Sequence, residues 1–318
     1  MPPDAIRFRN VSRYYGDQAA VRDLSLNIRE GELVVLLGPS GCGKTTTLRM
    51  INRLINPSAG VIEVNGRDVA EHNPEELRRG IGYVIQATGL FPHLTVRQNI
   101  EVVPRLLGWE QERRRKRAAE LLELVSLDPA EYLERFPVDL SGGQQQRVGV
   151  ARALAADPPV LLMDEPFGAV DPITRERLQE EFLDLQNRLG KTVVFVTHDL
   201  DEAVKLADRV CLMRAGRVEQ FAEPEELLRA PASPFVEQFT GPQRSLKLLG
   251  RITVGAALRE EVPTDTPAEV SRDLDLRTAL SVLLDYGTDT AVVVDEAGNR
   301  VGGLWLSDIA RFSGRDPE

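Results

Sequence analysis

The fold of this chain is decided by one stretch of its sequence, Gly38-Pro39-Ser40-Gly41-Cys42-Gly43-Lys44-Thr45. An apolar run over residues 33–37 precedes it and a helical pattern over residues 46–54 follows it, which predicts a strand, a loop and a helix. Glycines let consecutive backbone N–H groups turn inward around a polyphosphate, and the new helix directs its positive dipole end at the same anion. Lys44 adds a positive charge at the phosphates and the Thr45 hydroxyl is a ligand for Mg²⁺, so the loop predicts a nucleoside triphosphate site.

The composition limits the class of protein. A chain of 318 residues, 42% apolar and 28% charged, can hold one large and one small globular domain, or two of middling size. The net charge of −10 argues against a protein that coats nucleic acid or an anionic bilayer by charge alone. The two cysteines, Cys42 and Cys211, fit a reducing compartment better than a disulfide framework.

We expect neither a signal peptide nor a transmembrane helix. The start, Met1-Pro2-Pro3-Asp4, has no basic stretch followed by an apolar core. No apolar run approaches the roughly 18 residues that a membrane span needs. The sequence therefore predicts an intracellular soluble chain, or one attached to a membrane through a partner.

The hydrophobic pattern predicts an α/β fold. Residues 1–40 and 61–69 alternate like strands, whereas residues 97–135 have helical periodicity. Between residues 158 and 213 apolar strands alternate with helices, which predicts a parallel sheet with crossover helices. Proline and glycine punctuation predicts a domain boundary near residues 241–250.

Three polar side chains follow two of these strands. Asp164 and Glu165 end the apolar run over residues 160–163, and His198 comes just after the run over residues 193–196. Ligands bind at the carboxyl ends of parallel strands. Asp164 would hold Mg²⁺, Glu165 would polarise the attacking water, and His198 would contact the γ-phosphate or that water. By itself such a strand end is more often a charged turn, but beside a phosphate loop the catalytic interpretation is favoured.

Three further features have both a functional and a structural interpretation. Ser141-Gly142-Gly143 opens a long helix, as a second anion-binding helix start or as a simple cap. Tyr15 could stack on a base, or form a strand surface pair with Tyr14. Gln86 lies where the core pattern gives way to the helical insertion, and alone it indicates little.

Together these residues resemble the ATP-binding-cassette (ABC) ATPases over about residues 4–240. The resemblance identifies Walker A with residues 38–45, the Q-loop with Gln86, the signature with residues 140–144, Walker B with residues 160–164 and the following Glu165, the D-loop with residues 168–171, and the switch histidine with His198. It implies a P-loop NTPase core with an antiparallel β subdomain and a helical subdomain at about residues 88–150, within a cassette domain over residues 1–240.

The resemblance also implies a head-to-tail homodimer that binds ATP and Mg²⁺ between two protomers. It implies catalytic roles for Lys44, Gln86, Glu165 and His198. It implies ATP contacts in one protomer from Tyr15, Gly38, Pro39, Ser40, Gly41, Cys42, Gly43, Lys44, Thr45 and Thr46, and contacts from the other protomer by Ser141, Gly142, Gly143 and Gln144. It implies a dimer contact at Asp171 and Mg²⁺ ligands at Thr45, Gln86 and Asp164.

Two segments narrow the resemblance to importers. Residues 81–100 are similar to the importer branch, and residues 102–109 resemble cassettes of osmoprotectant importers for glycine betaine, choline, carnitine or proline. This implies an ATPase at the cytoplasmic face of the membrane, with permease subunits at the Gln86 loop and helical subdomain and an external solute-binding protein. The basic run at residues 113–117 is expected to be a solvated helix face, so no nucleic acid is expected. The alternative is a soluble ABC ATPase with a regulatory or nucleic-acid-associated role and no membrane partner.

The C-terminal segment, residues 245–318, predicts a small α+β domain. Its helix–strand–turn–strand–helix order resembles a cystathionine-β-synthase-type (CBS) regulatory motif. One motif is clear, so pairing is expected across the homodimer or with residues 245–270. Nucleotide-binding versions often have Thr or Ser where this chain has Trp305, three residues before Asp308, which argues against nucleotide binding there. The segment could bind a nucleotide, sense ionic strength or only dimerise.

Overall fold

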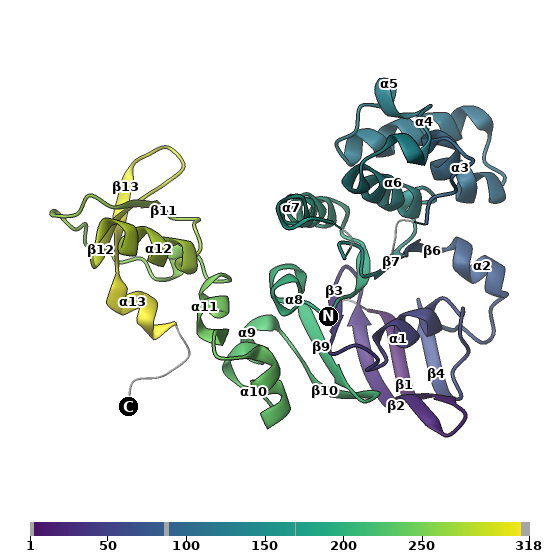
Figure 1. Ribbon diagram of the computed structural model, residues 1–318, viewed down its shortest axis with the longest axis horizontal. Coiled ribbons are helices and arrows are strands. Elements are labelled where there is room, and N and C mark those ends of the chain that lie inside the picture. The colour runs from purple at the N-terminus through teal and green to yellow at the C-terminus, as the bar shows by residue number, and fades with distance from the viewer. Residues whose placement is uncertain (1–2, 86–88, 169, 313–318) are drawn as a thin grey trace. The chain divides into compact units, whose positions relative to one another are not determined.

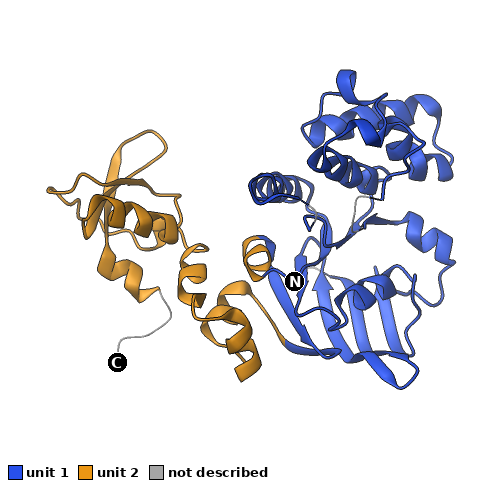
Figure 2. Cartoon of the chain, viewed as in Figure 1, with its two compact units in different colours: residues 1–199, 206–219 blue, residues 200–205, 220–318 orange. Residues whose placement is uncertain are grey.

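The structure is a computed structural model of the chain and describes residues 3–85, 89–168 and 170–312. Its contacts form two compact units (Figure 2): unit 1 is Met1–Asp199 with Leu206–Glu219, and unit 2 is Leu200–Lys205 with Gln220–Glu318. The domain limits expected from the sequence, 1–240 and 245–318, stay a prediction.

A largely parallel sheet forms the centre of unit 1. Its strand order is β10-β9-β3-β8-β7-β6, and the five strands from β9 to β6 run parallel to their neighbours. Its strands are β3 (Leu33–Leu37), β6 (Ile81–Val84), β7 (Val160–Asp164), β8 (Thr192–Val196), β9 (Arg209–Arg214) and β10 (Arg217–Ala222). Every residue of β3, β7 and β8 is buried, as expected for apolar strands covered on both faces. The predicted parallel sheet is confirmed.

A second, antiparallel sheet has the order β2-β1-β4-β5. Its strands are β1 (Asp4–Tyr15), β2 (Gln18–Arg29), β4 (Ala59–Val64) and β5 (Arg67–Asp68). The β1–β2 hairpin closes where Tyr15 pairs with Gln18, and Gly16 in the turn has a φ of +57°. The alternating pattern of the first residues therefore corresponds to this sheet.

Helices of unit 1 either follow the strands or form a separate group. After β3 comes α1 (Lys44–Ile51), which contacts β7 and β8, and the long α7 (Pro172–Leu189) precedes β8. The group contains α3 (Val96–Leu106), α4 (Gln111–Leu124), α5 (Pro129–Tyr132), the 3₁₀ turn η1 (Pro137–Asp139) and α6 (Gly142–Leu154) (Figure 1). The remaining short helix, α2 (Pro74–Arg79), follows β5. The helical periodicity predicted over residues 97–135 is confirmed.

Buried Asn99 fixes the start of the helical group. Its amide donates to the carbonyl oxygens of Phe91, Leu94 and Thr95 at 3.0–3.1 Å, and its Oδ1 accepts from the Phe91 N–H. A capping box between Thr95 and Gln98 begins α3. The segment that enters the group is thus held by side-chain hydrogen bonds where the chain has no regular structure.

Unit 2 has its own apolar core. A three-stranded sheet of order β11-β12-β13 packs with α12 and α13 around buried Leu283, Val293 and Leu304. The elements of unit 2 are α9 (Pro224–Arg229), α10 (Pro234–Thr240), α11 (Arg244–Leu249), η2 (Val254–Ala256), β11 (Glu269–Ser271), α12 (Leu276–Tyr286), β12 (Thr290–Val294), β13 (Arg300–Trp305) and α13 (Leu306–Arg311). The helix α8 (Leu200–Leu206) spans the boundary between the two units. The order helix–strand–turn–strand–helix is the one expected after residue 272. In neither unit do the described residues include a helix with the length and apolarity needed to span a membrane.

Candidate functional site

The glycines of the phosphate loop have left-handed backbone conformations, and two of them also lie against neighbouring backbone. Gly38, Gly41 and Gly43 have φ values of +142°, +78° and +109°. A Cβ on Gly43 would lie 2.4 Å from the carbonyl oxygen of Ala20, and one on Gly38 would lie 2.2 Å from that of Met213. The loop therefore packs its backbone directly against β2 and β9, and only glycine fits at these two contacts.

Lys44 holds its ammonium group inside this loop. The side chain is buried, and Nζ donates to the carbonyl oxygens of Gly38 at 2.6 Å and Pro39 at 3.1 Å. An ammonium has three donors, and the third makes only a long contact of 4.0 Å to Cys42 Sγ, which an anion over the loop can replace. Burial raises the pKa of the neighbouring Cys42 thiol, so this group stays uncharged near neutral pH. The loop thus presents positive charge without a competing thiolate.

Thr45 joins the loop to the carboxyl end of β7. Its Oγ1 donates to Asp164 Oδ1 at 2.9 Å, and Asp164 is only 2% exposed. Burial raises the pKa of Asp164, while the Thr45 hydrogen bond and the charge of Arg49 lower it. A hydroxyl beside a carboxylate is a ligand pair suited to a hard cation such as Mg²⁺. The described residues hold no group of three or more His, Cys, Asp or Glu that could bind a metal, so phosphate oxygens or water would have to complete such a site.

Arg49 is a residue of this site that the sequence analysis missed. Its Nη2 lies 3.8 Å from Asp164 Oδ2, and Arg49 partly offsets the rise that burial causes in the pKa of Tyr83 on β6. Arg49 lies four residues after Thr45 on α1, and residues four apart share a helix face. That spacing is the signal by which it could have been found.

Glu165 and His198 meet at the same edge of the sheet. Glu165 follows β7 with a φ of +44°, and its N–H donates to the carbonyl of Val196 on β8 at 3.0 Å. The Nδ1 atom of His198 lies 3.4 Å from Glu165 Oε1. Left-handed conformations of non-glycine residues cluster at functional sites. The structure therefore brings together Asp164, Glu165 and His198 as the strand order predicts.

Tyr15 lies exposed at the β1–β2 turn. Its side chain is 49% exposed, and the Arg13 guanidinium lies 4.6 Å from the centre of its ring. Neighbouring Tyr14 is exposed as well. Both tyrosines are accessible to a base, and the stacking role of Tyr15 stays a prediction.

Ser141 caps the start of α6. Its Oγ accepts from the Gln144 N–H at 3.4 Å, and Gln144 Oε1 accepts from the Ser141 N–H at 2.8 Å. Gln144 Nε2 also donates to the Tyr132 hydroxyl, which fixes the amide. Ser141 and Gly142 are exposed, and a Cβ on Gly142 would meet nothing within 4 Å. The predicted cap is therefore present, and the start of α6 is exposed. It lies in a different part of unit 1 from α1, the helix that follows the phosphate loop (Figure 1).

Asp171 caps α7, a role that the sequence analysis did not assign. Its Oδ1 accepts from the Thr174 N–H at 3.1 Å, and hydrogen bonds from Thr174 hold the pKa of Asp171 below its usual value. The pattern Asp-Pro-x-Thr, with proline at the first helical position, could have revealed this cap. Gln86 and the D-loop residue Ala169 lie outside the described residues, so their expected contacts stay predictions.

Known proteins match this chain over most of its length. Residues 21–168 match the family model described as ABC transporter. The "Carnitine transport ATP-binding protein OpuCA" of Listeria monocytogenes is 52% identical over 300 residues, 94% of this chain and 74% of that protein. The "Glycine betaine uptake system ATP-binding protein YehX" of Escherichia coli is 47% identical over 305 residues, 96% of this chain and 98% of that protein. The solved dimer of the ATP-binding cassette MJ0796 with ADP and Pi is 37% identical, with a TM-score of 0.61, and the match covers 69% of this chain and 98% of that one.

Proposed function

The chain belongs to the family of ABC transporter ATP-binding proteins, and from that premise we propose that its cargo is a quaternary-amine osmoprotectant such as glycine betaine, choline or carnitine. It has the ABC cassette fold and is an ATPase coupled to solute import. The cargo class is supported by relatives named for carnitine and glycine betaine that match nearly the whole chain. These relatives do not favour the alternative, a soluble ABC ATPase with a regulatory or nucleic-acid-associated role.

The hydrogen bond between Thr45 and Asp164 carries the assignment of the catalytic site. It joins the phosphate loop to the strand edge that holds Glu165, so nucleotide and attacking water can lie at one place. In this proposal the backbone N–H groups of the loop and the Lys44 ammonium bind the β- and γ-phosphates of ATP. Thr45, Asp164 and Gln86 would hold Mg²⁺, which supplies positive charge that stabilises the negative charge developing on the phosphates.

Hydrolysis needs a polarised water in line with the γ-phosphate. Glu165 is the group we assign to that water, because its carboxylate lies at the carboxyl edge of the sheet beside Asp164. His198, whose imidazole is next to Glu165 Oε1, is assigned to orient this carboxylate or to contact the γ-phosphate. Tyr15 would stack on the adenine.

A second protomer completes the site in this proposal. Ser141, Gly142, Gly143 and Gln144 of one protomer would contact the ATP held by the loop of the other, and Asp171 would contact the partner. The exposed helix start at Ser141 supports this assignment, because unpaired N–H groups and the helix dipole attract a γ-phosphate. ATP would favour the closed dimer, since both protomers contact the γ-phosphate only in that state. Hydrolysis removes these contacts and lets the dimer reopen.

The transport partners follow from the family. ABC importer ATPases act with membrane permease subunits, which we place at the Gln86 loop and the helical group α3–α6. An external solute-binding protein would deliver the solute. The chain would thus lie at the cytoplasmic face of the membrane, held there by the permease.

Unit 2 is proposed as a CBS-like regulatory or dimerisation module. Asp308 is buried, and its Oδ1 accepts from Arg259 at 2.6 Å. The Arg259 guanidinium also lies 4.8 Å from the centre of the Trp305 ring. Asp308 is therefore engaged through Oδ1, while its buried Oδ2 has no hydrogen-bond partner among the described residues; the Arg259 contact supports a packing or ionic-strength-sensing role over nucleotide binding at this aspartate.

Transport in proteoliposomes tests the proposed cargo. The chain, reconstituted with its permease and solute-binding partners, should drive ATP-dependent uptake of at least one labelled solute among glycine betaine, choline and carnitine. The matched control is Glu165→Gln, which should abolish uptake while leaving assembly intact. Uptake of a different solute alone, driven by the same ATP turnover, would contradict the cargo class and leave the ATPase assignment standing.

A further inference from the structure

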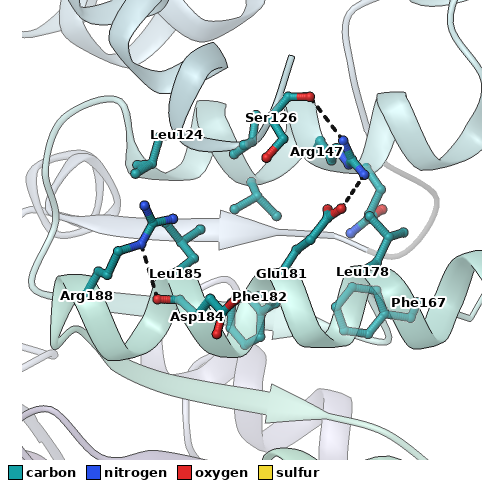
Figure 3. Close-up of a pocket in the computed structure, with 13 residues that line it drawn as sticks. Leu124, Ser126, Arg147, Phe167, Leu178, Glu181, Phe182, Asp184, Leu185 and Arg188 are labelled. Atoms are coloured by element: carbon teal, nitrogen blue, oxygen red, sulfur yellow. Dashed lines mark hydrogen bonds and ion pairs between the residues drawn. The ribbon is translucent and has the colours of Figure 1, made fainter. Parts of the chain in front are cut away.

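We propose that a cavity between α6 and α7 binds a small uncharged molecule with a compact apolar body and one hydrogen-bond-accepting oxygen. The cavity has a volume of about 110 Å³ and lies between the helical group and the helix that precedes β8 (Figure 3). Its lining comes from α4, α6, α7 and the segment after β7. None of these residues belongs to the ATP site described above.

The floor of the cavity is apolar and buried. Val150, Phe167, Leu178, Phe182 and Leu185 line it, and all are buried. The two phenylalanine rings pack edge to face with centroids 6.3 Å apart, and each also packs against the ring of buried Phe195. An apolar cavity of about 150 Å³ lined by Leu, Ile and Phe stays dry and binds benzene, so this floor suits a group no larger than a phenyl ring.

Buried Gln146 supplies the second observation. It lines the cavity and is 3% exposed, and within the described part of the chain its Nε2 has no hydrogen-bond partner. A buried amide donor without an acceptor is a cost that folded proteins rarely leave uncompensated. Nε2 itself is covered by neighbouring atoms, so the Gln146 amide has to turn toward the cavity before a ligand oxygen can accept from it and remove that cost. The ligand therefore carries an acceptor next to its apolar body.

The mouth of the cavity carries charges of both signs. Arg147 donates to Glu181 at 2.7 Å and to the carbonyl oxygen of Ser126 at 3.2 Å, and Figure 3 shows these contacts running from α6 to α7 and to the turn after α4. Asp184 and Arg188 lie exposed at the same mouth and add one charge of each sign. The two negative and two positive side chains at the mouth balance one another, which favours an uncharged ligand over an ion.

An occupant would act on the starts of both helices. Gln146 lies one turn into α6, which Ser141 caps, and Leu178 lies on α7, which Asp171 caps. Near those caps the helices are in tight contact, because a Cβ on Gly143 would lie 3.1 Å from Thr174 Cγ2. A ligand that fixes the separation of α6 and α7 is therefore expected to change ATP turnover by altering the position of Ser141.

Methyl NMR titrations with two probes test the site. Acetophenone carries a ring and a carbonyl oxygen, whereas ethylbenzene is an apolar analogue without the oxygen. Acetophenone should give saturable shifts of the Val150, Leu178 and Leu185 methyl groups. Gln146→Leu, which removes the donor at similar volume, should weaken acetophenone binding about fivefold, the factor expected for one hydrogen bond, without weakening ethylbenzene. Val150→Phe should fill the cavity and abolish both sets of shifts.

Three results would overturn the proposal. One is the absence of saturable shifts at these methyl groups with either probe. Another is an equal effect of Gln146→Leu on both probes, or no effect on acetophenone. The third is unchanged binding to a folded Val150→Phe variant. If Val150→Phe does not give the cooperative thermal transition of the parent chain, Leu185→Phe replaces it in the same comparison.

Discussion

Replacing Gly43 with alanine should destabilise the chain by an amount that follows from two features of the phosphate loop. Gly43 has a φ of +109°, and its added Cβ would lie 2.4 Å from the carbonyl oxygen of Ala20. A non-glycine residue in a sparsely populated region costs about 1–3 kcal/mol. The obstacle is backbone rather than a flexible side chain, so relieving it adds about 1–3 kcal/mol, as overpacking does. A total of about 2–6 kcal/mol lowers Tm by roughly 4–24 °C at about 2–4 °C per kcal/mol.

Gly41→Ala is the matched control for this prediction. Gly41 lies in the same loop with a φ of +78°, but a Cβ there would meet nothing within 4 Å. Only the left-handed strain of about 1–2 kcal/mol remains, which lowers Tm by roughly 2–8 °C. Calorimetry of both variants without nucleotide measures the difference. If Gly43→Ala loses no more thermal stability than Gly41→Ala, the close contact between the loop and β2 is wrong.

Three further substitutions test the site and its supports. Lys44→Ala should abolish ATP turnover, because the ammonium over the loop is lost; phosphate release at the parent rate would mean that the loop is misassigned. Glu165→Gln should bind ATP and accumulate as a nucleotide-bound dimer visible by light scattering, whereas unchanged turnover would remove Glu165 from its role. Asp171→Ala should lower Tm at pH 7, because it removes the cap of α7. Hydrogen bonds hold the pKa of Asp171 down, so its stabilisation is full above the ordinary carboxyl pKa, and the Tm difference should shrink below about pH 4; a difference independent of pH would contradict this.

Local patterns predicted much of the nucleotide site. The strand, loop and helix around Lys44 are adjacent in sequence, so glycine spacing and hydrophobic periodicity were enough to predict them. The meeting of Thr45 with Asp164 is long-range, yet it follows from a general property of parallel sheets, whose carboxyl strand ends share one edge. Backbone topology thus brings Thr45 and Asp164 to one edge of the sheet, and the hydrogen bond between their side chains follows from that placement.

Features that depend on side-chain packing were not predictable in the same way. The approach of Gly43 to Ala20 depends on how β2 lies against the loop, which no local pattern encodes. The cavity beside Gln146 depends on side-chain volumes from separate helices, and an apolar stripe on a helix does not reveal whether its partners fill the space. By contrast, the place of Arg49 in the site and the cap by Asp171 could have been predicted, because helix spacing indicates the first and the Asp-Pro-x-Thr pattern indicates the second.

The central claim is that each ATP is enclosed by the phosphate loop of one protomer and the Ser141 helix start of another. Its most direct test is the ATPase activity of a mixture of two inactive variants, Lys44→Ala and Ser141→Arg. Each mixed dimer regains one pocket with an intact loop and an intact helix start, so activity should reappear on mixing and be absent from either variant alone. A Ser141→Arg variant that hydrolyses ATP at the parent rate, or a mixture as inactive as its components although mixed dimers form, would contradict the shared pocket.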